Sequence, residues 1–248
     1  MAPDVPVYGI HFRDDIPERP VTVASMAARY VDEVLRIAPR GPYNLGGFCS
    51  GAVIALEMAY QLLERRQEVG LVVILDHALV DSSIPRSRLG RAWDFVRNVP
   101  LWAVDDLWAV GTAEVWGRVK SRARLVNGRL RRDRSHQSSG RSVDIRDALG
   151  MWRFPDGHVR ILESQWTAIR SHRHRSSPYP GRVALIKPRA LPLLARHQAD
   201  DLGWRRFISG ELTIIRVPGS HETMLYEPFT IELSERLRAL LDRCANAM

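Results

Sequence analysis

The sequence predicts an α/β fold, in which helices flank a mostly parallel sheet. Two observations support this prediction. Short apolar runs rich in β-branched residues alternate with amphipathic stretches of helical period, and each connection is long enough for a right-handed crossover between parallel strands. In addition, a chain of 248 residues with 45% hydrophobic residues is long enough to bury the core of one large domain.

Five runs are interpreted as buried strands, because each is apolar and is bounded by Gly, Pro or Asp. They are Val5–Phe12, Tyr43–Phe48, Leu71–Leu79, Arg182–Arg189 and Leu212–Val217.

Three stretches carry apolar residues at helical spacing, which predicts helices with one buried face. They are Thr22–Ala38, Ser50–Arg66 and Pro228–Arg243, the last with a proline at its expected first turn.

The interval of about 82–180 interrupts this alternation and is interpreted as a helical lid inserted into a single domain, whose core is 1–81 and 181–248. The lid shows helical patterning and a polar stretch at 131–142 that predicts a loop. It also holds six of the seven tryptophans, which we expect to line its apolar underside, where they pack or hold an acyl chain: Trp93, Trp102, Trp108, Trp116, Trp152 and Trp166.

The formal net charge of +8 is concentrated in the lid. Arg86 to Arg175 contains 19 Lys and Arg against 9 Asp and Glu, so the rest of the chain is slightly acidic. Such a surface can face water, an acidic protein or nucleic acid. Because Arg118–Arg134 has basic residues but few interleaved aromatic residues and no nucleic-acid motif, nucleic acid is the least favoured of the three.

The two cysteines, Cys49 and Cys244, give neither a disulfide framework nor a spacing typical of metal ligands. No apolar run approaches the length of about 20 residues that spans a bilayer, and the first residues do not form a signal peptide. The expectation is a cytoplasmic protein with no membrane segment and no metal.

The pentad Gly47-Phe48-Cys49-Ser50-Gly51 lies between a predicted strand and a predicted helix. This is the context in which G-x-S-x-G forms the nucleophile elbow of α/β-hydrolases. The helix N-terminus favours a thiolate at Cys49, and the Ser50 N–H can serve as an oxyanion donor. We expect glycines on both sides because the turn leaves no room for side chains. The alternative is that Cys49 is only a small buried apolar residue.

An acid and a base follow in the chain order expected for this fold. Asp76 closes a predicted strand, so its carboxylate lies at the same sheet edge as the elbow and can orient an imidazole; otherwise it only caps a turn. His221 follows the last strand at a Pro-Gly-Ser turn. The other histidines considered, including His77, His172 and His174, lie in no such motif and are expected to be packing or surface residues.

A specific family resemblance begins at Gly41–Leu62 (GPYNLGGFCSGAVIALEMAYQL). This segment resembles the elbow region of the thioesterase domains that terminate nonribosomal peptide and polyketide assembly lines. The resemblance continues at Pro6–Gly9, Leu75-Asp76, Tyr179–Val183, Asp201–Trp204 and Pro218–His221. The lid is the least similar part.

The resemblance implies an α/β-hydrolase fold and a Cys49-His221-Asp76 triad that takes an acyl or peptidyl chain from the 4′-phosphopantetheine arm of a carrier protein. Release then occurs by hydrolysis, cyclisation or aminolysis in natural-product biosynthesis. The implied partner is an acyl or peptidyl carrier protein, and no other cofactor is implied. Most members of the family have serine at the elbow, whereas this chain has Cys49.

Members of this family normally begin one strand earlier, and the loop after that strand supplies the second oxyanion N–H. This sequence enters almost directly at Val5–Phe12, so the first strand of the family pattern is expected to be missing, and the second donor is not identifiable.

Two other functions stay open. A dienelactone-hydrolase-like enzyme also uses a cysteine elbow but takes its acid after a later strand, which would select Asp201. A non-catalytic module that only docks carrier domains would keep Cys49 as a buried thiol.

Overall fold

The computed structural model describes residues 6–10, 21–79, 87–107, 156–190, 198–221 and 223–246. Its centre is a parallel sheet of four strands in chain order: β1 (Tyr43–Phe48), β2 (Val69–Leu75), β3 (Val183–Pro188) and β4 (Leu212–Val217). Phe48 lies opposite Leu75, and Leu75 lies opposite Ile186. The carboxyl ends of the first three strands therefore meet at one edge, as the predicted site requires.

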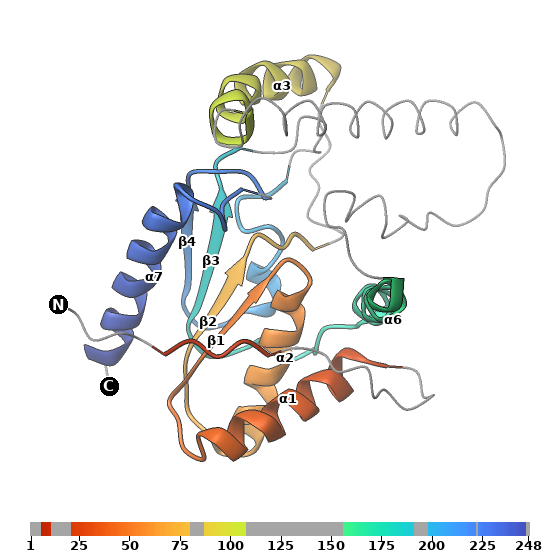
Figure 1. Ribbon diagram of the computed structural model, residues 1–248, viewed down its shortest axis with the longest axis vertical. Coiled ribbons are helices and arrows are strands. Elements are labelled where there is room, and N and C mark those ends of the chain that lie inside the picture. Colours follow the sequence, from red (N-terminus) through yellow and green to blue (C-terminus); the bar gives the residue numbers. More distant parts are fainter. Residues whose placement is uncertain are drawn as a thin grey trace, which may run out of the picture.

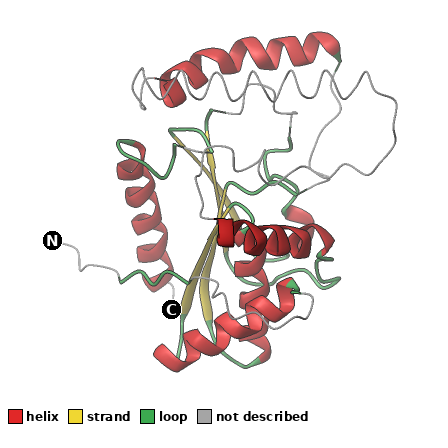
Figure 2. Ribbon diagram, turned by 45° about the vertical axis from the view of Figure 1, so that its right-hand side comes forward, coloured by secondary structure: helices red, strands yellow, loops and turns green. Residues whose placement is uncertain are grey.

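Helices cover both faces of the sheet, as Figure 1 and the turned view of Figure 2 show. The helices α1 (Val23–Ile37) and α2 (Gly51–Glu64) lie on one face, and α7 (Phe229–Asn246) lies on the other. Alternate strand residues divide between two cores: Val72 and Ile74 pack with α1 and α2, whereas Leu71 and Val73 pack with α7. Because side chains alternate across a strand, both faces are apolar and both are covered.

The predicted helices and four of the predicted strands are confirmed to within a few residues. Helix α1 begins after Thr22 because Thr22 and Ser25 form a reciprocal capping box. The largest difference at these boundaries is in β2, which ends at Leu75 rather than Leu79. Asp76 has a φ of 45°, and this left-handed conformation turns the chain out of the sheet.

The prediction of a buried strand at Val5–Phe12 is wrong for the residues that the structure describes. Residues 6–10 have no regular secondary structure, and Val7 is 90% exposed. Within the described ranges β1 pairs only with β2, and residues 6–10 form no ladder with its other edge. An apolar alternating pattern gives a strand only where a hydrogen-bonding neighbour exists.

Three described stretches of the expected lid are helical, as predicted: α3 (Arg88–Trp102), the π-helical turn η2 (Ala103–Leu107) and α6 (Asp156–Ser171). Residues 172–180 contain no helix. Trp93 is 65% exposed, so its expected burial on the underside of the lid is wrong. This residue lies on the exposed side of α3. The polar stretch 131–142 and three lid tryptophans lie outside the described residues: Trp108, Trp116 and Trp152.

Among the described residues, no helix is both long and apolar enough to cross a bilayer. The same residues contain no group of three or more His, Cys, Asp or Glu side chains placed to hold a metal ion.

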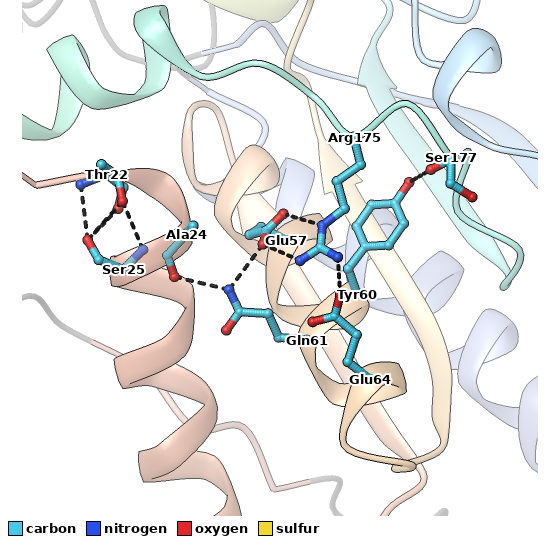
Figure 3. A network of polar contacts seen from close by, with 9 residues as sticks. All are labelled: Thr22, Ala24, Ser25, Glu57, Tyr60, Gln61, Glu64, Arg175 and Ser177. Atoms are coloured by element: carbon cyan, nitrogen blue, oxygen red, sulfur yellow. Dashed lines mark hydrogen bonds and ion pairs between the residues drawn. The ribbon is translucent and has the colours of Figure 1, made fainter.

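An ion pair joins α2 to the segment that follows α6 (Figure 3). The Arg175 guanidinium donates to both carboxylate oxygens of Glu57, at 3.1 and 2.7 Å, and also contacts Glu64. Gln61 donates to Glu57 and to the Ala24 carbonyl, both at 3.0 Å. The Glu57 side chain is only 5% exposed, so this network ties the end of the lid to the helix that carries the elbow.

Candidate active site

The elbow at Cys49 has the backbone that the sequence predicts. Cys49 has a φ of 51°, which is uncommon for a residue other than glycine, and its N–H donates to the Leu75 carbonyl at 2.9 Å. Helix α2 begins two residues later. A strained nucleophile held at a strand-to-helix turn is the arrangement of an activated elbow residue.

The two flanking glycines are not equivalent. A Cβ on Gly47 would lie 2.3 Å from the Gly51 carbonyl carbon, so only glycine fits there. A Cβ on Gly51 would meet no atom within 4 Å. The expectation that both positions exclude a side chain is therefore wrong for Gly51.

The Ser50 amide is available at the start of α2. Within the described part of the chain, this N–H has no hydrogen-bond acceptor, whereas the following amides of Ala52 and Val53 bond to the Cys49 and Ser50 carbonyls. An unsatisfied N–H at a helix N-terminus beside the thiol is the donor that an oxyanion needs.

Asp76 and His221 meet at the carboxyl edge of the sheet. The Asp76 N–H donates to the Ile186 carbonyl at 2.9 Å, which fixes the residue just beyond β2. Its Oδ2 lies 2.7 Å from Nδ1 of His221. The His221 ring also stacks on Phe48, with ring centroids 4.7 Å apart. The imidazole is thus oriented by a carboxylate and by the aromatic residue that precedes Cys49.

Two imidazoles influence the pKa of the Cys49 thiol. Burial by itself raises the pKa of this thiol, but hydrogen bonds with His221 and His77, and the charges of both rings, lower it to about 6. Burial likewise lowers the pKa of His221, but its hydrogen bonds with Asp76 and Cys49 raise it to about 10. The two shifts have opposite directions, and both favour a thiolate beside an imidazolium.

We therefore expect Cys49 to react with iodoacetamide in mildly acidic solution. The pKa of the thiol is lowered, so the rate of alkylation rises as the pH rises through about 6 and then stays constant. Peptide mapping after timed alkylation measures this rate separately from that of Cys244, which is buried in α7. A midpoint near the ordinary cysteine value of about 8.5 would contradict the ion pair.

Asp201 is hydrogen-bonded to backbone amides of its own turn rather than to His221. Its two carboxylate oxygens accept the backbone N–H groups of Gly203 and Arg205, at 3.1 and 3.0 Å. Because it holds its own turn, we expect Asp201→Asn to change thioester turnover by less than about threefold. Asp76→Asn is expected to lower turnover by about 10³-fold or more, through the wrong His221 tautomer. Steady-state assays of the two variants compare them directly, and the reverse order would assign the acid to Asp201.

Sequence reasoning missed one side chain that acts on the pKa of Cys49. His77 helps to lower the pKa of this thiol, although this histidine was expected to be a packing or surface residue. Its position directly after Asp76, just beyond the end of β2, is the signal that places it at this edge. His174 does pack as expected, against Phe207 and Trp204.

Sequence reasoning also missed the support under the His221 loop. Thr223 accepts the Ser220 N–H at 2.8 Å and donates to the Asp105 carbonyl at 2.9 Å. The fully buried Asp105 side chain in turn forms a bidentate ion pair with Arg189, both contacts being 2.6 Å. These contacts join η2 to the loop that carries His221. The residues that form them are far apart in the sequence, so no local pattern predicts the contacts.

Comparison with known protein families finds a match to thioesterase domains. The model of the thioesterase domain family matches residues 2–88, which include β1, the elbow, α2 and β2. Chondramide synthase of Chondromyces crocatus is 26% identical over 237 residues, which is 90% of this chain and 6% of the synthase. The dimodular nonribosomal peptide synthase of Bacillus subtilis is 39% identical over 78 residues, 31% of this chain and 3% of that protein. The chain thus spans a small part of these relatives.

Solved structures extend the similarity to most of the chain. The NocB thioesterase domain, solved as a covalent complex with a fluorophosphonate nocardicin G analogue, is 25% identical with a TM-score of 0.54 and covers 90% of this chain and 77% of that one. The RedJ thioesterase of the Streptomyces coelicolor prodiginine pathway is 16% identical with a TM-score of 0.51 and covers 88% and 71%. The parallel sheet with its flanking helices is therefore an α/β-hydrolase fold.

Proposed function

We propose that this chain is a thioesterase that releases an acyl or peptidyl group from the phosphopantetheine arm of a carrier protein through an acyl-Cys49 intermediate. The observation that carries the proposal is the His221 ring, which is hydrogen-bonded to Asp76 and stacked on Phe48, the residue before Cys49 at the elbow. The similarity to a nonribosomal peptide synthase supports a carrier-borne substrate in natural-product biosynthesis.

The first step begins from the thiolate of Cys49. Its sulfur attacks the thioester carbonyl, and the Ser50 N–H is the donor that this chain offers to the oxygen that gains charge. When the tetrahedral intermediate collapses, the bond to the pantetheine sulfur breaks, and that sulfur takes the proton from the His221 imidazolium. The products are acyl-Cys49 and a neutral imidazole.

In the second step the neutral His221 serves as general base. It takes a proton from water, from a hydroxyl or from an amine, and that nucleophile attacks the acyl-Cys49 carbonyl. Collapse expels the Cys49 thiolate, and His221 is again an imidazolium beside it. Asp76 keeps the ring in one tautomer throughout.

A thioester assay tests this function. Acyl and aminoacyl thioesters of N-acetylcysteamine mimic the pantetheine arm, and release of the free thiol reports turnover. We expect turnover by the native chain and its loss in Cys49→Ala. Failure to turn over any thioester, with active hydrolysis of an enol-lactone, would favour the dienelactone-hydrolase-like alternative. No turnover of either class would favour the non-catalytic docking module.

Cys49 gives the acyl-enzyme a different reactivity from that of a serine enzyme. Exchange of one thioester for another is nearly neutral in free energy, so acyl-Cys49 stays reactive enough for cyclisation or aminolysis. We expect Cys49→Ser to shift the products toward hydrolysis. Chromatographic separation of hydrolysed and cyclised products from a peptidyl thioester with an internal amine measures this. An unchanged product ratio would show that the Cys49 thiol does not determine which acceptor reacts.

A further inference from the structure

We propose that Thr223 is a positioning residue for the His221 imidazole, because it fastens the His221 loop (residues 219–221 and 223–224) to the turn η2. The Thr223 hydroxyl accepts the Ser220 N–H at 2.8 Å and donates to the Asp105 carbonyl at 2.9 Å. Thr223, Ser220 and Asp105 are all buried, so water does not replace these hydrogen bonds. The catalytic consequence rests on the proposed use of His221 as the base, whereas the contacts do not.

The His221 ring depends on this loop for its position. Its contacts with Asp76, at 2.7 Å, and with Phe48, at 4.7 Å between ring centroids, set the direction of the ring. The side chain is nevertheless 33% exposed, so the loop backbone fixes where the ring begins. A displacement of about 1 Å at a reacting group can cost about 10²-fold in rate. An anchor of the loop can therefore affect turnover without contacting the substrate.

One side of the loop is fastened to the end of β3. The Arg189 N–H donates to the Val217 carbonyl at 2.9 Å, and the Ala190 N–H donates to the Gly219 carbonyl at 3.2 Å. These bonds continue the pairing of β3 with β4 beyond both strands. The chain therefore leaves the sheet at Gly219 in a fixed direction.

The other side of the loop is fastened to η2 through Thr223. The Asp105 carboxylate is fully buried and holds the Arg189 guanidinium by two contacts of 2.6 Å. A buried carboxylate requires its counter-charge, so this pair fixes η2 over the end of β3. The backbone carbonyl of Asp105 then accepts the Thr223 hydroxyl. The position of η2 thus determines the position of the loop that carries the base.

Alkylation of Cys49 tests the positioning without any thioester. Peptide mapping gives the pH at which the iodoacetamide rate reaches half its maximum. Valine matches threonine in shape but lacks the hydroxyl, so we expect Thr223→Val to raise this pH by about half a unit or more, through the displaced imidazole. Thr223→Ser keeps the hydroxyl and is expected to leave the pH in place. An unchanged value in Thr223→Val would overturn the proposal.

Two further variants separate positioning from general loosening of the fold. Asp105→Asn/Arg189→Met frees η2 from β3 without leaving a buried charge, and we expect it to shift the alkylation profile in the same direction as Thr223→Val. Arg175→Met breaks the ion pair between α2 and the segment after α6 and is expected to cause no shift. An equal shift in Arg175→Met, or none in the double variant, would overturn the role of η2.

Turnover of an acyl N-acetylcysteamine thioester tests the catalytic consequence. We expect Thr223→Val to lower kcat about tenfold with KM within about twofold, because the base moves and the substrate surface does not. Thr223→Ser is expected to keep kcat within about threefold of the native value. A loss confined to KM, or an equal loss in Thr223→Ser, would overturn the positioning role. The alkylation shift without thioester turnover by the native chain would refute the proposed function and leave the positioning of His221 standing.

Discussion

Replacement of His221 by glutamine is expected to lower kcat/KM for thioesters by about 10³-fold, because it removes the base of the second step and the cation beside the thiolate. The variant also loses the side chain that lowers the pKa of Cys49 most. The pH at which the alkylation rate of Cys49 reaches half its maximum therefore moves up from about 6. Both changes are measured on one preparation, by a thiol-release assay and by timed alkylation.

The matched control for this variant is His172→Gln. His172 lies on the segment after α6 and contacts His174 rather than the thiol. We expect its turnover and its Cys49 midpoint to stay near those of the native chain. If His221→Gln kept native turnover while its circular dichroism was unchanged, His221 would not be the base.

The second large effect concerns stability. Arg175→Met leaves the Glu57 carboxylate in a site where its side chain is 5% exposed, with Gln61 as its remaining partner. Removing one partner of a buried ion pair costs about 3 kcal/mol of unfolding free energy. The double variant Glu57→Gln/Arg175→Met is expected to recover part of this loss, because no buried charge remains. Urea denaturation of the three proteins measures the differences.

The pH dependence of this loss has a definite sign. Burial raises the pKa of Glu57, but hydrogen bonds from Arg175 and Gln61 bring it below its usual range. A lowered pKa in the folded state stabilises the native chain above the unfolded value of about 4.3, and that contribution is lost as the pH falls through the folded value. The difference between native and Arg175→Met therefore shrinks in acid.

An exposed ion pair provides the control. Arg65 contacts Asp32 at 2.5 Å, but their side chains are 38% and 65% exposed. Arg65→Met is expected to cost less than about 1 kcal/mol, because water replaces the lost contact. A loss as large as that of Arg175→Met would show that burial of Glu57 is not the cause.

Local sequence patterns predicted most of the sheet and its helices. The predicted bounds of the strands Tyr43–Phe48 and Leu212–Val217 equal the observed ones. Apolar runs bounded by turn residues indicate a short buried strand. The same pattern failed at Val5–Phe12, where pairing depends on a neighbouring strand rather than on the segment itself. The end of β2 was misplaced because a left-handed aspartate is not visible in hydropathy.

The site was predictable where its parts carry a motif. The elbow places Cys49, and the order of nucleophile, acid and base selects Asp76 and His221. Contacts that arise only from the fold were not predictable: Asp105 pairs with Arg189 across 84 positions of sequence, and Thr223 donates to the Asp105 carbonyl. Such pairs share no local spacing, so a single sequence contains no signal for them.

The central claim is that the acyl group passes through Cys49. Its most direct test is to quench the protein in acid soon after mixing with an acyl N-acetylcysteamine thioester, and to locate the acyl group by mass spectrometry of the digested chain. The account predicts an acylated peptide containing Cys49, formed at the rate of turnover and absent in Cys49→Ala. An acyl group on another residue, or undiminished turnover by Cys49→Ala, would contradict it.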